Sequence, residues 1–169
     1  MIAYLDTSSL AKLYLVESGM DDVRALTSAA DVKATSVIAF VEMRSALARK
    51  RRGGEIPADE YRSALRVFGE DWNGLTRVTV TGDLVRHAGE LAERHAIRGM
   101  DAIHLASALW LRTQEGRGRI VFSTSDTDLG RAAREEGLST TLEEDLGGSP
   151  GDALRLRERR VRWRRARKR

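Results

Sequence analysis

Ile2-Ala3-Tyr4-Leu5-Asp6 opens the chain with a short, largely apolar run that ends at a carboxylate. A run of this kind is typical of a buried strand. A second one, Ile120-Val121-Phe122, is followed by Ser123-Thr124-Ser125-Asp126. The chain therefore carries acidic residues just beyond an early and a late predicted strand. In an open parallel sheet, functional groups gather at these carboxyl ends of the strands.

The sequence between the two runs shows helical periodicity interrupted by weaker strands. The predicted helices span 8–16, 20–30, 37–47, 57–68, 83–95, 101–109 and 129–136, and Ser36 is the predicted cap of the third. The predicted strands span 2–5, 32–35, 75–80, 119–122 and 140–142. Because strands and helices alternate, we expect a three-layer α/β fold, with helices flanking a mostly parallel central sheet of four to five strands.

Length and composition exclude several classes of protein. A chain of 169 residues usually forms one main domain. The chain has no cysteine, which excludes a disulfide scaffold, a thiolate zinc site and a cysteine nucleophile. With three histidines, a metal would be held mainly by oxygen, which favours Mg²⁺ or Mn²⁺. No segment reaches the roughly 20 apolar residues of a membrane span, so we expect a cytoplasmic protein with no membrane partner.

Charge is distributed unevenly along the chain, whose formal net charge is +4. Residues 151–169 hold nine arginines and one lysine against two acidic residues, a charge of +8, which leaves the remainder at −4. The Gly147-Gly148-Ser149-Pro150-Gly151 run marks the boundary, so we predict a body at 1–146 and a Gly/Pro hinge with an Arg-rich tail at 147–169. The tail suits RNA phosphates, or is a solvated terminus with no specific role. The candidate contacts are Arg162, Arg164 and Arg165.

Four carboxylates stand in apolar surroundings, namely Asp6, Glu42, Asp101 and Asp126. Acidic side chains are rarely buried without a partner, and a shared divalent ion would offset their repulsion. Each also has an ordinary alternative. Asp101 and Asp126 could cap helices, Asp6 could end a strand in a turn, and Glu42 could form an ion pair. Together, in this topology, they favour a metal site that activates a water and stabilises charge on a phosphodiester.

The acidic residues lie in four longer motifs, which occur in a fixed order. These are Asp6-Thr7-Ser8-Ser9-Leu10-Ala11, Val41-Glu42-Met43-Arg44-Ser45-Ala46-Leu47, Met100-Asp101-Ala102-Ile103-His104-Leu105-Ala106 and Thr124-Ser125-Asp126. In this order they resemble the PIN-domain family and, within it, the VapC-type toxins of bacterial toxin–antitoxin pairs. The resemblance covers residues 1–142, and four acidic motifs in order are far more specific than a single Asp-Thr-Ser.

The resemblance implies a Mg²⁺- or Mn²⁺-dependent endoribonuclease that cleaves structured RNA, such as tRNA, to inhibit translation. It implies that four positions act as catalytic metal ligands, with Asp6, Glu42 and Asp101 at the three invariant positions and Asp126 at the fourth. Ser8 and Thr124 match hydroxyl positions that support the first and fourth acids. The family also implies a homodimer and a small VapB-type antitoxin. The competing hypothesis is a non-catalytic PIN-like module that binds RNA or a protein.

Three further features lie near these motifs. Two of them, His104 and the basic run 49–52, each have two interpretations. His104 shares a helix face with Asp101, and packing in the core is favoured over a role in orienting a ligand. The basic run 49–52 could face RNA or suit a helix C-terminus, where the dipole favours cations. Arg98 is the better candidate for a phosphate contact, because it neighbours Asp101.

Overall fold

The computed structural model describes residues 1–114 and 119–141, and within them strands alternate with helices. The strands are β1 (Ile2–Leu5), β2 (Val32–Ser36), β3 (Thr76–Val78), β4 (Ile120–Ser123) and β5 (Ser139–Thr140). The helices are α1 (Thr7–Ala11), α2 (Met20–Ala29), α3 (Ala39–Arg52), α4 (Ala58–Asp71), α5 (Gly82–His95), α6 (Gly99–Gln114) and α7 (Thr127–Glu135), with a 3₁₀ turn η1 at Trp72–Gly74. Each predicted element has a counterpart, which confirms the α/β class.

The five strands form one sheet in the order β3-β2-β1-β4-β5, and every pairing among them is parallel. β1 lies at the centre, with Ile2 opposite Val32 of β2 and Ile120 of β4. All four of its residues are buried, which explains the apolar run at the start of the chain. From β1 the chain builds outward to β2 and β3, and later to β4 and β5 on the other side. The carboxyl ends of β1 and β4 therefore flank a topological switch point, where ligands bind in open α/β sheets.

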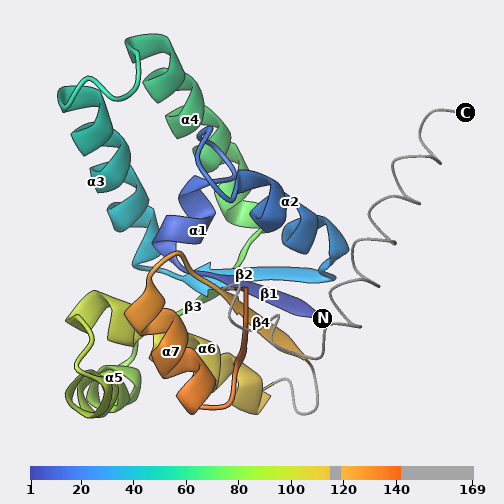
Figure 1. The fold of residues 1–169 in the computed structure, drawn as a ribbon, viewed down its shortest axis with the longest axis vertical. Helices are drawn as coiled ribbons and strands as arrows, with labels where there is room; N and C mark the ends of the chain where they lie inside the picture. Colours follow the sequence, from blue (N-terminus) through green and yellow to red (C-terminus); the bar gives the residue numbers. More distant parts are fainter. Residues whose placement is uncertain (115–118, 142–169) are drawn as a thin grey trace, which may run out of the picture.

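Helices cover both faces of the sheet (Figure 1). α1, α2, α3 and α4 lie on one side and α5, α6 and α7 on the other. Each side has its own hydrophobic core. Tyr4 packs with α5–α7 residues, whereas the next residue, Leu5, packs with the opposite helices, as the alternation of a strand requires. In the described ranges, no helix combines the length and the apolar content that a membrane crossing requires.

Two local predictions differ from the structure. α1 ends at Ala11 rather than at residue 16, and the chain continues in turns, with the Leu13 N–H donating to the Leu10 carbonyl over 3.1 Å. Ser36 is not a helix cap, because Ile38 occupies that position of α3 and Ser36 ends β2. The Ser36 hydroxyl is buried and has no hydrogen-bond partner in the part of the chain that the structure describes. The predicted boundary after residue 146 and the basic tail lie outside the described residues.

Candidate active site

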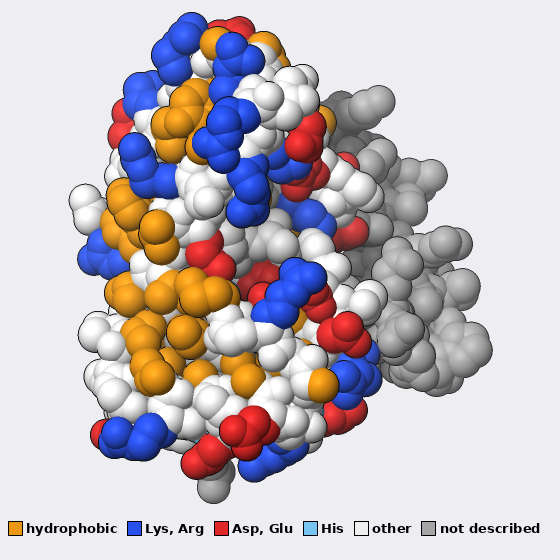
Figure 2. Space-filling view, turned by 90° about the vertical axis from the view of Figure 1, so that its left-hand side faces the viewer, with side chains coloured by type: hydrophobic (Ala, Val, Ile, Leu, Met, Phe, Trp, Pro, Cys, Tyr) orange, Lys and Arg blue, Asp and Glu red, His pale blue; other side chains and the backbone are white. Residues whose placement is uncertain are grey.

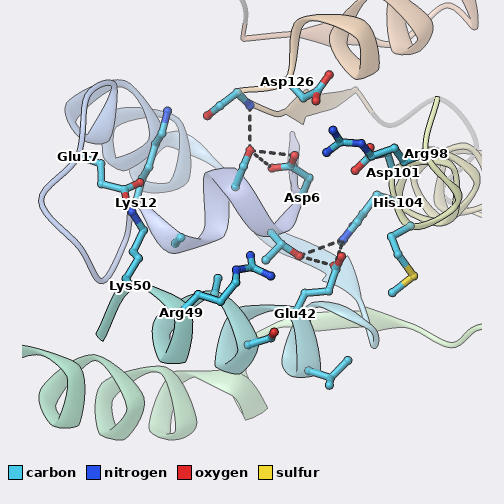
Figure 3. Close-up of a pocket in the computed structure, with 18 of the residues that line it drawn as sticks. Asp6, Lys12, Glu17, Glu42, Arg49, Lys50, Arg98, Asp101, His104 and Asp126 are labelled. Carbon is cyan, nitrogen blue, oxygen red and sulfur yellow. Dashed lines mark hydrogen bonds and ion pairs between the residues drawn. The ribbon is translucent and has the colours of Figure 1, made fainter. Parts of the chain in front are cut away.

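A pocket opens at the carboxyl ends of β1 and β4, between α1, α3 and α6 (Figure 3). Its lining includes the four acidic residues that the sequence singled out, Asp6, Glu42, Asp101 and Asp126. In the space-filling view, acidic side chains occupy the middle of one face, with basic side chains above them and apolar ones below (Figure 2). The fold thus brings together four carboxylates that come from segments far apart in the sequence.

Asp6 is the most firmly held of these carboxylates. It follows β1 directly and caps α1 by accepting a hydrogen bond from the Ser9 N–H over 2.8 Å. The Ser8 hydroxyl donates to both carboxylate oxygens at 2.8 and 2.9 Å, and the Thr124 hydroxyl donates to Oδ2 at 2.6 Å. Asp6 is only 5% exposed. Ser8 and Thr124, the two expected supporting hydroxyls, both therefore contact this acid.

Asp126 combines the two roles that the sequence left open. It caps α7, with Oδ1 accepting a hydrogen bond from the Leu129 N–H over 2.9 Å, and it also lines the pocket. Its own N–H donates to the Thr124 hydroxyl over 3.0 Å. Since Thr124 also contacts Asp6, one hydroxyl connects the first and the fourth acid across the ends of β1 and β4.

Asp101 lies in the first turn of α6, where the charges of the other aspartates reach it. Burial raises the pKa of its carboxyl above the ordinary value, and the negative charges of Asp126 and Asp6 raise it further. Arg98 and His104 act in the opposite direction but do not cancel the effect. The three aspartates therefore repel one another, and a cation among them would relieve that repulsion.

Glu42, in the first turn of α3, is held differently. Its Oε2 accepts hydrogen bonds from the Thr7 hydroxyl at 2.6 Å and from His104 Nε2 at 2.9 Å. Burial acts to raise the pKa of Glu42, but the hydrogen bonds from His104 and Thr7 and the charges of His104 and Arg49 outweigh it, so the pKa lies below its ordinary value. Glu42 is therefore a charged acceptor at neutral pH.

The donor set fits a hard divalent cation, although no finished metal cage is present. Among residues 1–114 and 119–141, no three His, Asp or Glu side chains already stand in an arrangement that would hold a metal ion. The carboxylate oxygens are nevertheless the ligands that Mg²⁺ and Mn²⁺ prefer. The repulsion at Asp101 is the observation that favours a cation among the three aspartates, with Glu42 set apart by its bonds to Thr7 and His104.

Four basic side chains also line the pocket: Lys12, Arg49, Lys50 and Arg98. Lys50 forms ion pairs with Glu17 at 2.8 Å and Glu55 at 3.1 Å, so its charge is largely compensated. Arg98 and Arg49 reach toward the acids from opposite sides (Figure 3). Arg98 was expected here from the sequence, whereas Arg49 belonged to a run with two open interpretations. The tail candidates Arg162, Arg164 and Arg165 lie outside the described residues.

Thr7 is the pocket residue that the sequence analysis missed. It lies between Asp6 and Ser8, both of which stood out, and its partner Glu42 is 35 positions away. The available signal was a hydroxyl inside the first acidic motif. The role of His104 was also only half foreseen, since it is buried in the core and at the same time bonded to Glu42.

The chain is similar in sequence to one family of known proteins. The PIN domain family model matches residues 3–135. Two Mycobacterium tuberculosis proteins, Ribonuclease VapC45 and Ribonuclease VapC49, are each 38% identical to this chain over 108 residues, which cover 64% of this chain and 75% of the relative.

Several solved structures share the fold at lower sequence identity. VapC20 from Mycobacterium tuberculosis, a sarcin-ricin loop cleaving toxin, has a TM-score of 0.58 and 21% identity and covers 77% of this chain and 94% of its own. PAE2754 from Pyrobaculum aerophilum has a TM-score of 0.56 and 16% identity, with coverages of 86% and 96%. VapBC2 from Rickettsia felis, bound to a promoter DNA fragment, has a TM-score of 0.55 and 16% identity, with coverages of 83% and 97%.

Proposed function

The chain belongs to the PIN domain family and is a VapC-type endoribonuclease of a toxin–antitoxin pair, and we propose that it cleaves RNA with the aid of Mg²⁺ or Mn²⁺. The observation that carries the metal dependence is the meeting of three aspartates, from the ends of β1 and β4 and the start of α6, in one pocket. Their mutual repulsion, seen at Asp101, favours a bound cation.

In this proposal the aspartates Asp6, Asp101 and Asp126 hold the cation, and Glu42 completes the site from α3. When bound, such a cation activates a water and stabilises negative charge on the phosphodiester. The chain itself supplies the orientation. Asp6 is fixed by its hydrogen bonds to Ser8, Ser9 and Thr124, so its carboxylate needs no rearrangement of the backbone to act as a ligand. These contacts support the proposed role of Ser8 and Thr124 in holding Asp6.

RNA would reach the acids between two arginines. Arg98 precedes α6 and Arg49 lies on the pocket face of α3, and both line the pocket. A strand that crosses the acidic centre would bring phosphates to each of them, and phosphate contacts position nucleic acid without reading its sequence. We assign Arg98 and Arg49 to this role. Arg162, Arg164 and Arg165 of the tail remain further candidates on the basis of their charge.

Two protein partners belong to the proposal, a VapB-type antitoxin and a second copy of the chain. Several of the solved structures that share the fold are VapBC complexes. The homodimer is supported by apolar side chains on the face that holds the pocket (Figure 2). Val41 of α3 and Met100 of α6 line the pocket and are 61% and 42% exposed, and exposed apolar patches mark interaction surfaces. An RNA target of this kind would place the activity in the cytoplasm.

The test is cleavage of total bacterial RNA by the purified full chain in Mg²⁺, in Mn²⁺ and in chelator. Asp6→Asn is the decisive variant, because asparagine preserves the cap of α1 while removing the charge. We expect discrete products that require metal and that fall by orders of magnitude in the variant. Asp128→Asn is the matched control, since the Asp128 side chain is 77% exposed and does not line the pocket.

Either of two results would contradict the proposal. Full cleavage by Asp6→Asn would overturn the assignment of the site. Failure of the folded wild-type chain to cleave in either metal, with RNA binding that survives chelation, would support the non-catalytic binding module instead.

A further inference from the structure

A chain of four side chains connects the buried core to Glu42. His104 of α6 is only 2% exposed, and its Nε2 lies 2.9 Å from Glu42 Oε2. On the other side of the ring, the hydroxyl of Tyr4 lies 3.2 Å from Nδ1. The Thr7 hydroxyl contacts the same Glu42 oxygen at 2.6 Å and lies 3.2 Å from His104 Nε2 (Figure 3). β1, α1 and α6 therefore all contribute to holding one carboxylate, which α3 carries.

The directions of these hydrogen bonds follow from the chemistry of the groups. A carboxylate only accepts, so Nε2 of His104 donates to Glu42. The Tyr4 hydroxyl lies within hydrogen-bond distance of Nδ1, on the other side of the ring. Burial raises the pKa of Tyr4 well above its ordinary value, so this hydroxyl keeps its proton. Glu42 and Tyr4 thereby hold the His104 ring from both sides.

Glu42 needs such support more than Asp6 and Asp126 do. Asp6 and Asp126 cap helices and are held by backbone N–H groups. Glu42 has a longer side chain, and the hydrogen bonds that hold it within the described ranges come from side chains alone, both to Oε2. Glu42 lines the pocket, and its Oε1 has no hydrogen bond to the other residues that the structure describes. A carboxylate anchored by one oxygen with the other one available is a common arrangement of metal ligands and their supporting residues.

We propose that Thr7 and His104 are positioning residues, which hold Oε2 of Glu42 so that Oε1 faces the cation, and that Tyr4 locks the His104 ring in this arrangement. The inference rests on the proposed function, because it concerns the geometry of the same site. It assigns to Thr7 and Tyr4 roles that the acidic motifs do not suggest. It also explains why a polar ring is buried on α6 among mostly apolar side chains.

The test compares Mn²⁺ affinity, measured by paramagnetic resonance or calorimetry, in Thr7→Val, Thr7→Ser, Tyr4→Phe and the wild-type full chain. Removal of a residue that supports a metal ligand typically weakens affinity about 10- to 100-fold, so we expect a loss of this size for Thr7→Val. Thr7→Ser retains the hydroxyl and should restore the affinity. Tyr4→Phe leaves His104 free to turn and should give a smaller loss in the same direction.

Thr27→Val is the matched control for these variants. Thr27 is a buried threonine, whereas Thr7 is half-buried, and among the described residues its hydroxyl bonds to backbone carbonyls within α2, at Val23 and Arg24, away from the pocket. It should change the melting temperature without changing Mn²⁺ affinity. A wild-type affinity in Thr7→Val, or a loss that Thr7→Ser does not restore, would overturn the positioning role. If the wild-type chain itself binds no Mn²⁺, the proposed function fails as well, and the two failures are thereby distinguished.

Discussion

The charged carboxylate of Asp101 destabilises the folded protein when no metal is bound. Its pKa is raised by burial and by the charges of Asp126 and Asp6, so the folded state binds this proton more tightly than the unfolded chain does. Stability therefore falls as pH rises above 3.8, the ordinary aspartate value, because the group must then ionise in an unfavourable place.

Asp101→Asn should accordingly stabilise the metal-free protein at pH 7.5, by about 0.5–1 kcal/mol, since interactions of partly exposed charges are weakened by solvent. The gain should shrink as pH is lowered through the raised pKa of Asp101, because the wild-type group then becomes protonated too. Urea unfolding at both pH values measures it, and Mn²⁺ should reverse the order by stabilising only the wild type. Equal stability of wild type and variant at pH 7.5 would show that the aspartates do not repel one another.

The sequence could locate the acids but not the groups that hold them. Asp6 and Asp126 follow apolar runs directly, so the position of a strand is enough to place each at the sheet edge. Thr7 was overlooked because its role depends on a contact with Glu42 that no local pattern encodes. Ser36 failed as a predicted cap for a related reason. A serine before a helical pattern favours capping, but pairing of Ser36 with Val78 extends β2 to that residue and shifts the helix start to Ala39.

Among the elements, α5 and α7 are joined by a clamp around the buried ring of His95, away from the pocket. His95, at the end of α5, places Nδ1 3.0 Å from Glu135 and Nε2 2.8 Å from Glu136, both near the end of α7. The pKa values of both glutamates lie below the ordinary value. The hydrogen bond from Arg131 is the main cause for Glu135, and the hydrogen bond from His95 is the main cause for Glu136.

His95→Gln should lower the free energy of unfolding by about 1 kcal/mol, the net value of one typical hydrogen bond, because only the contact with Glu136 is well shielded from solvent. Both glutamates have pKa values below their ordinary 4.5, so their contribution is complete above that pH and is lost as pH falls through the folded-state values. Wild type and variant should therefore converge in chemical denaturation as pH is lowered below 4.5. His87→Gln on the same helix is the control and should change stability little. A variant that retained wild-type stability at neutral pH would mean that the clamp is only a surface contact.

The elements themselves were more predictable than their ends. Runs such as Ile120-Val121-Phe122 can be interpreted directly, because a central parallel strand is buried on both faces and therefore apolar throughout. The end of α1 was misplaced because Leu13 and Leu15 follow a helical spacing, whereas the chain turns after Ala11 and Leu15 still reaches the core. The spacing reports which residues are buried, and several backbone paths satisfy it.

At the scale of the whole molecule, the charge pattern separates binding from chemistry. The acidic centre lies in the body, whereas the largest concentration of positive charge lies in residues 151–169, outside the described ranges. A strongly basic segment binds RNA through its phosphates, and the affinity from these contacts falls steeply as the salt concentration rises. Cleavage depends instead on the pocket. The two contributions should therefore respond to different variants.

Replacing Arg162, Arg164 and Arg165 together by glutamine should weaken RNA binding and flatten its salt dependence. For single-stranded RNA the slope of log affinity against log salt changes by about 0.7 for each phosphate that the protein no longer neutralises, so three arginines correspond to a change of about 2. Binding is measured in chelator, so that no RNA is cleaved, and the cleavage rate at saturating RNA with metal should stay near the wild-type value.

The control replaces three exposed arginines of the body, Arg62, Arg66 and Arg86, with the same change in net charge. If both triple variants flatten the slope equally, net charge alone drives binding, and if neither does, the tail is a solvated terminus. Only a selective effect of the tail variant would assign it to the RNA, because a steering field acts through total charge whereas a direct phosphate contact acts through position.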